Sequence, residues 1–117
     1  RDWSSDVCSS DLDDIEVQVV RGDDVFAESG WPSLDLIKLD VEGAELEILR
    51  GLTGVLQGHR PALILEIHGP YLPMFGGSGQ EVVEWLRAQG YRLEPLDRVN
   101  PRWNEENTTV WASRADG

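Results

Sequence analysis

The stretch LDLIKLDVEGAELEILRG, residues 34–51, decides the fold that we expect for this chain. Its first part, residues 34–41, is apolar enough to form a strand that is buried on both faces for most of its length. Gly43 then opens a helix, and Arg50 and Gly51 supply the cation and the glycine that are typical of a helix end. A buried strand that leads directly into a helix is the building unit of parallel α/β sheets.

The same alternation of strand and helix patterns continues on both sides of this stretch. The apolar and β-branched runs predict strands at residues 15–20, 34–41, 62–67, 91–96 and 108–112. Helices are expected at residues 25–30, from Gly43 to Gly51, as a short turn at 55–56, and from a Ser78–Glu81 capping box to Gly90. We therefore expect an α/β, doubly wound and mostly parallel sheet, with the last two strands antiparallel at one edge.

The composition restricts the class of partner. The 117 residues allow one domain, and 22 acidic against 10 basic residues give a formal net charge of -12. Such a surface repels phosphate backbones and anionic membranes, so we expect neither a nucleic-acid nor a membrane partner. The single cysteine, Cys8, excludes an intrachain disulfide and a thiolate zinc site. It fits a reducing compartment, and we expect a cytoplasmic protein.

The beginning of the chain is unusual. Residue 1 is Arg and the only methionine is Met74, so we expect a fragment of a longer reading frame. Residues 1–12, RDWSSDVCSSDL, contain a short internal echo and have neither helical nor strand periodicity. They resemble translated sequencing-adapter sequence at the ends of metagenomic reading frames. We predict a non-native leader at residues 1–12 and a domain from residue 13 to 117; a native acidic lead-in is the alternative.

Polar residues follow three of the predicted strands. Sheets of this class bind ligands beyond the carboxyl ends of their strands, where acidic groups can bind ribose or adenine, hold a hard cation or act as a general base. The residues concerned are Asp23 and Asp24 after the first strand, Asp40 and Glu42 after the second, and Glu66 and His68 at the end of the third.

Each of these residues also has a purely structural interpretation. Asp23 can cap the next helix, and Glu42 and Glu45 can offset the dipole of a helix in its first turn. His68 precedes a Gly-Pro pair and can be an ordinary loop histidine. Asp40 is the strongest functional candidate, because a carboxylate that ends a buried apolar strand is costly to desolvate without a partner or a role.

Residues 36–51, LIKLDVEGAELEILRG, resemble the signature of FkbM-type methyltransferases. The similarity extends to about residues 15–113. It implies a Rossmann-like class I methyltransferase fold, of which this chain is the C-terminal half. It also implies methyl transfer from S-adenosylmethionine, usually to a hydroxyl group of a sugar or secondary metabolite, which would be the small-molecule acceptor.

The resemblance also implies roles for individual residues. Asp23 would lie near the adenine of the cofactor, and Asp40 would face the methyl donor and the acceptor. We expect Asp40 to orient the acceptor or act as base, with His68 as the alternative base. Glu42 is placed at the same cofactor-binding edge, where it fixes the turn from strand to helix. Some related sugar methyltransferases hold a divalent cation at these strand ends, which makes Asp40 and Glu66 the candidate metal ligands.

One expected part of the family pattern is missing. No glycine-rich turn from strand to helix precedes Ile15, so the loop that approaches the methionine part of the cofactor should lie upstream. We therefore predict that the isolated chain is unstable or inactive, with an exposed sheet edge that favours aggregation. The rival interpretation is a non-catalytic α/β module that binds a metal or a protein through its acidic rim. A nucleotide-binding domain would need a phosphate-binding glycine loop, which is absent.

Overall fold

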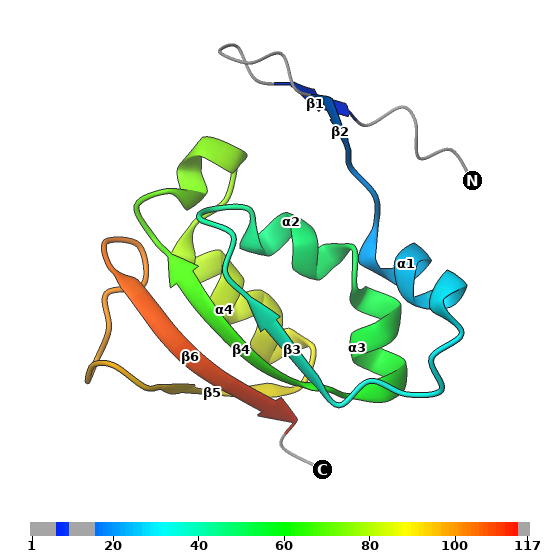
Figure 1. Ribbon diagram of the computed structural model, residues 1–117. Helices are drawn as coiled ribbons and strands as arrows, with labels where there is room; N and C mark the ends of the chain where they lie inside the picture. Colours follow the sequence, from blue (N-terminus) through cyan, green and yellow to red (C-terminus); the bar gives the residue numbers. More distant parts are fainter. Residues whose placement is uncertain (1–6, 10–15, 115–117) are drawn as a thin grey trace.

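A four-stranded mixed sheet forms the centre of the computed structural model, which describes residues 7–9 and 16–114 (Figure 1). The strand order is β3-β4-β6-β5, with β3 parallel to β4 and β6 antiparallel to both β4 and β5. Three strands therefore run in one direction and β6 runs in the other, which confirms the expected α/β class. The strands are β3 (Leu36–Leu39), β4 (Ala62–His68), β5 (Tyr91–Pro95) and β6 (Asn107–Arg114).

The expected antiparallel pairing of the last two strands at one edge of the sheet is confirmed. Strand β6 lies between β4 and β5 and pairs antiparallel with both, so β5 is the outermost strand. Burial explains the order, because β6 alternates fully buried and half-buried residues along most of its length. Strand β5 instead exposes Arg92 and Glu94 and contains Pro95, which has no N–H for a second ladder. The edge position therefore suits β5.

The helices follow the predicted order, with shifted starts. They are α1 (Gly22–Ser29), α2 (Glu45–Arg50), α3 (Thr53–His59), the 3-10 helix η1 (Leu72–Phe75) and α4 (Gly79–Ala88). The expectation that Gly43 opens a helix was wrong, since α2 begins at Glu45. Glu42 and Gly43 have φ angles of 51° and 118°, which no right-handed helix accommodates. The predicted cap of α4 is confirmed, because the Ser78 hydroxyl accepts from the Glu81 N–H at 3.1 Å.

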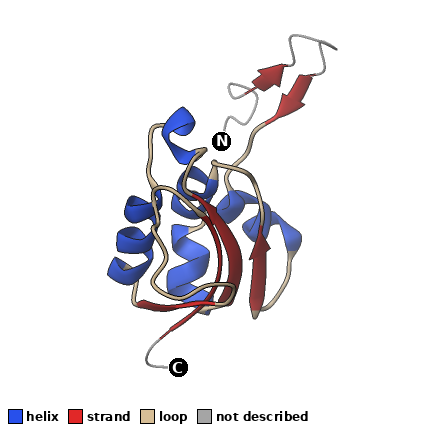
Figure 2. Ribbon diagram, turned by 90° about the vertical axis from the view of Figure 1, so that its left-hand side faces the viewer, coloured by secondary structure: helices blue, strands red, loops and turns tan. Residues whose placement is uncertain are grey.

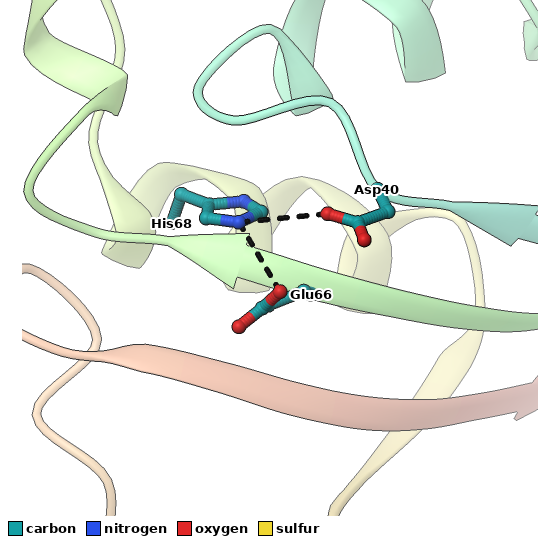
Figure 3. A group of neighbouring side chains, drawn as sticks. All are labelled: Asp40, Glu66 and His68. Carbon is teal, nitrogen blue, oxygen red and sulfur yellow. Dashed lines mark ion pairs between the residues drawn. The ribbon is translucent and has the colours of Figure 1, made fainter.

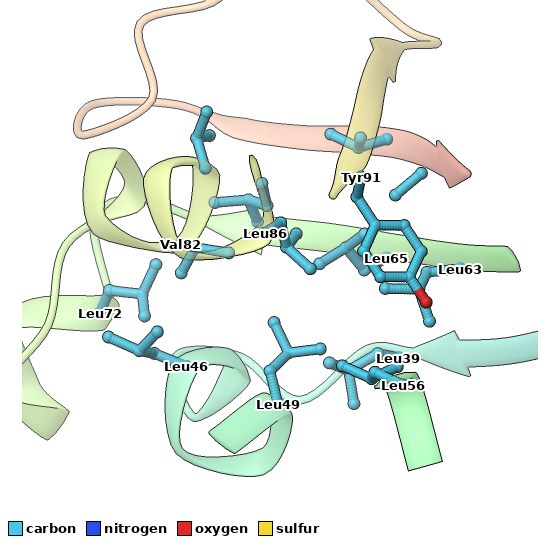
Figure 4. Close-up of a cluster of buried hydrophobic side chains, with 14 residues drawn as sticks. Leu39, Leu46, Leu49, Leu56, Leu63, Leu65, Leu72, Val82, Leu86 and Tyr91 are labelled. Carbon is cyan, nitrogen blue, oxygen red and sulfur yellow. The ribbon is translucent and has the colours of Figure 1, made fainter. Parts of the chain in front are cut away.

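One hydrophobic core joins the sheet to the helices (Figure 4). Leu39, Leu65 and Val110 are direct neighbours across β3, β4 and β6, so they lie on the same face. Leu49 of α2 and Leu86 of α4, both fully buried, pack onto this face. The other core residues are Leu46, Leu56, Leu63, Ile67, Leu72, Val82, Val83, Tyr91 and Ala112.

Tyr91 closes this core at the start of β5. Its hydroxyl donates to the Pro61 carbonyl oxygen at 2.7 Å, and burial raises the pKa of the phenol above its ordinary value. The bond joins β5 to the segment that enters β4. Packing in the core therefore holds β3 and β4 in place, and this positions the residues at their carboxyl ends.

The beginning of the described chain forms a separate two-stranded ladder. Strand β1 (Val7–Ser9) pairs antiparallel with β2 (Glu16–Gln18), and both stand apart from the main sheet in Figures 1 and 2. The strand expected at 15–20 is thus shorter than predicted and does not join the main sheet. The expectation of no regular structure in residues 1–12 was wrong for Val7–Ser9, which pair with Glu16–Gln18. Whether residues 1–12 are a leader stays a prediction.

Two further expectations concern the edges and the membrane. Within the described residues β3 is an edge strand, and Leu36 on it is 50% exposed. Aggregation through this edge stays a prediction. None of the helices in residues 16–114 is long and apolar enough to cross a membrane.

Candidate functional site

Three polar side chains meet where β3 and β4 end (Figure 3). Asp40 directly follows β3, and Glu66 and His68 lie in the last three positions of β4. The parallel register, in which Leu39 pairs with Leu65, brings Asp40 beside these positions. The His68 Nε2 atom lies 3.6 Å from Asp40 Oδ1 and 3.2 Å from Glu66 Oε1. The residues that the sequence singled out at two separate strand ends thus form one cluster.

The cluster has a buried side and a solvent side. The side chain of His68 is only 5% exposed, and its ring stacks on that of Tyr71 with a centroid distance of 6.0 Å. The side chains of Asp40 and Glu66 are 57% and 34% exposed. The imidazole is therefore the inner wall of the site, and the two carboxylates are accessible to a ligand from solvent.

Glu45 is the residue of this site that sequence reasoning missed. It is fully buried, and its Oε1 accepts from the Gly43 N–H at 2.6 Å, while Oε2 accepts from the His68 N–H at 3.1 Å. His68 Nδ1 lies 3.2 Å from Oε1. The sequence had suggested a dipole-offsetting acid in a helix. A signal was present, because Glu45 precedes Leu49 and Leu52 by four and seven positions and so shares their apolar stripe.

The polar atoms of the cluster repel one another unless solvent or a cation screens them. His68 Nε2, Asp40 Oδ1 and Glu66 Oε1 lie within 4.8 Å of one another, and the two oxygens only accept hydrogen bonds. A lone pair on Nε2 that faces the two carboxylates is repelled by them unless water or a cation screens their charge. Water at the two exposed carboxylates reduces the repulsion, and a divalent cation between the three atoms would remove it, because imidazole and carboxylates form a suitable donor set.

The turn between β3 and α2 holds the cluster together. Glu42 is exposed in this turn with a φ of 51°, and Gly43 follows with a φ of 118°. A Cβ on Gly43 would lie 3.0 Å from the Tyr71 carbonyl oxygen and from the Phe75 ring. Only glycine therefore permits both the backbone angle and the close approach of the η1 segment. Binding of a cofactor by Glu42 stays a prediction.

Asp23 lies in a different part of the structure. It is in the first turn of α1, which packs against α3, whereas Asp40 and His68 lie at the ends of β3 and β4 (Figures 1 and 3). The two carboxylate oxygens of Asp23 accept from the N–H groups of Gly54 and Val55, each at 2.9 Å. Asp23 therefore caps α3 and not its own helix, whose N-cap is Arg21. Its predicted place near adenine is untested.

A sequence profile of the methyltransferase FkbM domain matches residues 2–93. The chain belongs to the FkbM methyltransferase family. In this FkbM-family chain the matched residues include β3, β4 and the turn to α2, and therefore Asp40, Glu66 and His68.

Curated relatives carry the same family relationship. The chain is 34% identical over 81 residues to the 31-O-demethyl-FK506 methyltransferase FkbM of Streptomyces tacrolimicus, which covers 69% of this chain and 29% of that protein. It is 38% identical over 52 residues to the hexuronic acid methyltransferase AglP of Haloferax volcanii, covering 44% of this chain and 21% of AglP. A match of 31% over 88 residues to the AMB antimetabolite synthetase AmbE of Pseudomonas aeruginosa covers 68% of this chain and 4% of AmbE.

This FkbM-family chain spans less than a third of the length of each of these three relatives. No solved structure matches it.

Proposed function

We propose that the protein carrying this chain transfers a methyl group from S-adenosylmethionine to a hydroxyl group of a sugar or secondary metabolite. The observation that carries the proposal is the meeting of Asp40, Glu66 and His68 at the carboxyl ends of two parallel strands. Family membership supports methyl transfer, and the names of FkbM and AglP support a small-molecule acceptor. In this proposal the sheet is the C-terminal half of a Rossmann-like class I domain.

In this proposal Asp40 binds the acceptor and removes its proton, and His68 accepts the proton next. S-adenosylmethionine supplies an electrophilic methyl group on a sulfonium sulfur. The acceptor hydroxyl binds to the exposed carboxylate of Asp40, which orients the oxygen and takes its proton as the oxygen–carbon bond forms and the sulfur–carbon bond breaks. His68 Nε2, 3.6 Å from Asp40, is the next proton acceptor.

The fit of these residues to the cofactor is partial. Asp40 and Glu42 are exposed at the carboxyl end of β3 and can face it, whereas both oxygens of Asp23 already accept hydrogen bonds from α3. We assign Asp40 and Glu42 to the cofactor edge, with Asp23 as the less accessible member. The glycine-rich loop is proposed to lie in a part of the protein that precedes residue 13.

Turnover by the intact protein tests the proposed function. The protein is incubated with S-adenosylmethionine and a panel of hydroxyl-bearing sugars and secondary metabolites, and products are followed by mass spectrometry. We expect S-adenosylhomocysteine and one methyl ether in equal amounts. A folded protein that neither binds S-adenosylmethionine in calorimetry nor forms S-adenosylhomocysteine would contradict the proposal and favour a non-catalytic binding module.

A divalent cation is the second group that this site can take. Asp40, Glu66 and His68 offer two carboxylate oxygens and one imidazole nitrogen, a donor set that suits Mn²⁺ or Mg²⁺. A bound cation would act as a Lewis acid on an acceptor oxygen. The residues of this chain fit such an ion because their three ligand atoms lie within 4.8 Å of one another.

Titration with Mn²⁺ alone tests the cation site. We expect selective paramagnetic broadening of the His68 NMR signals, and binding weakened at least about tenfold by Glu66→Gln. Glu94→Gln is the control, because Glu94 is an exposed acid on β5 of the same sheet. If Mn²⁺ leaves the His68 signals unchanged, the site holds no cation. Mn²⁺ binding without any methyl transfer would point to the binding-module alternative.

A further inference from the structure

We propose that Glu45 is a positioning residue that accepts a hydrogen bond from the Nδ1–H group of His68, so that Nε2 is the ring nitrogen that faces Asp40 and Glu66. This inference rests on the proposed function for its catalytic meaning. Its structural content does not depend on turnover.

Glu45 accepts hydrogen bonds on both carboxylate oxygens. The Gly43 N–H and the His68 N–H are backbone groups, which can only donate, at 2.6 Å and 3.1 Å. Oε1, which accepts from Gly43, also lies 3.2 Å from His68 Nδ1. Because Glu45 Oε1 can accept but not donate a hydrogen bond, its contact with Nδ1 is attractive only if Nδ1 carries a hydrogen. The geometry around Glu45 therefore selects an Nδ1–H group.

The other side of the ring competes for the same proton. A neutral imidazole has one N–H, which can point to Glu45 through Nδ1 or to Asp40 and Glu66 through Nε2. Asp40 and Glu66 are 57% and 34% exposed, so water can solvate them when Nε2 has no hydrogen. Glu45 is 0% exposed, so water cannot solvate its carboxylate in the same way. A lone pair on Nδ1 would lie 3.2 Å from the buried Glu45 oxygen with no water to screen the repulsion, so a single ring hydrogen belongs on Nδ1.

Glu45 is itself held rigidly. It begins α2, and Leu46 and Leu49 of the same helix are buried in the core. Its three contacts join the start of α2, the Gly43 turn and the end of β4. The ring of His68 is further restrained by Tyr71. The imidazole can therefore present a basic nitrogen to the exposed carboxylates without reorienting, as general bases and metal-ligating histidines require.

Nitrogen-15 NMR of the wild-type protein reads the proton position directly. Spectra of the labelled, untagged protein are recorded in alkaline solution, and a His59→Gln variant assigns the two histidines. We expect His68 as the Nδ1–H tautomer. A His68 signal of the Nε2–H tautomer would overturn the inference, whatever the activity of the protein.

The Glu45→Gln variant tests the consequence. An amide has one acceptor oxygen for three donors, so its NH₂ group faces at least one N–H. We expect loss of the pure Nδ1–H tautomer and a kcat lowered by about 10- to 100-fold. Glu47→Gln is the matched control, because Glu47 is exposed on the same helix and its loss of charge is equal.

The two readouts separate the possible failures. Wild-type tautomer and turnover in Glu45→Gln would overturn the positioning role. An Nδ1–H tautomer in a protein without any methyl transfer would refute the proposed function and leave the positioning intact. If Glu45→Gln does not fold, the wild-type tautomer still decides.

Discussion

Replacing Asp40 by Asn is expected to lower kcat by roughly 10²- to 10⁴-fold, the range contributed by a positioned general base. The amide has nearly the shape of the carboxylate but takes no proton from the acceptor hydroxyl. It also removes a negative charge 3.6 Å from His68 Nε2, which weakens that nitrogen as the next acceptor. Initial rates of S-adenosylhomocysteine formation by the intact protein measure the effect.

The fold should survive this substitution. The Asp40 side chain is 57% exposed and lies outside the core, so we expect the unfolding midpoint in urea to change little. Asp35→Asn is the control: Asp35 is an exposed acid that precedes β3 at its other end, and its variant should keep wild-type kcat. Near-normal turnover of Asp40→Asn would remove Asp40 from the mechanism and leave His68 as the base.

Gly43→Ala is expected to cost about 3 kcal/mol of folding stability or more. Two penalties add: a φ of +118° that side chains rarely adopt, and a Cβ placed 3.0 Å from the Tyr71 carbonyl oxygen and the Phe75 ring. The shift that relieves the contact would also displace the Gly43 N–H, which donates to Glu45. We therefore expect turnover to fall together with stability, both measured on the intact protein by urea unfolding and by initial rates.

Gly30→Ala separates the two penalties. Gly30 also has a positive φ, +77°, but a Cβ there would meet nothing within 4 Å. Its variant should lose only about 1 kcal/mol and keep its activity. Equal losses in the two variants would show that backbone strain alone matters and that the packing of η1 on the turn contributes nothing.

The strands that carry the site could be predicted from the sequence because both are runs of mostly apolar residues. The run expected at 62–67 is β4 with one further residue, and the run at 34–41 contains β3. Strand β4 alternates buried and half-buried residues, whereas β3 is an edge strand of which only Leu39 is buried, so the expectation that residues 34–41 are buried on both faces was wrong. The shared end of parallel strands then placed Asp40 near Glu66 and His68 without knowledge of any contact.

Pairing and burial that depend on distant residues could not be predicted in the same way. The position of β6 between β4 and β5 is a choice among partners, and local periodicity is identical for an inner and an edge strand; only Pro95 hinted at the order. Glu45 has an equally good local explanation as a helix-start acid. Its burial depends on His68, which lies 23 residues further along the chain. The capping of α3 by Asp23 likewise spans 31 residues.

The most direct test of the account is a crystal structure of the intact protein with S-adenosylhomocysteine. We expect the cofactor sulfur to lie at the carboxyl end of β3, facing the carboxylate of Asp40, with His68 Nδ1 donating to Glu45. A cofactor bound elsewhere on the protein, with Asp40 turned away from the sulfur, would contradict the assignment of this cluster as the site of methyl transfer.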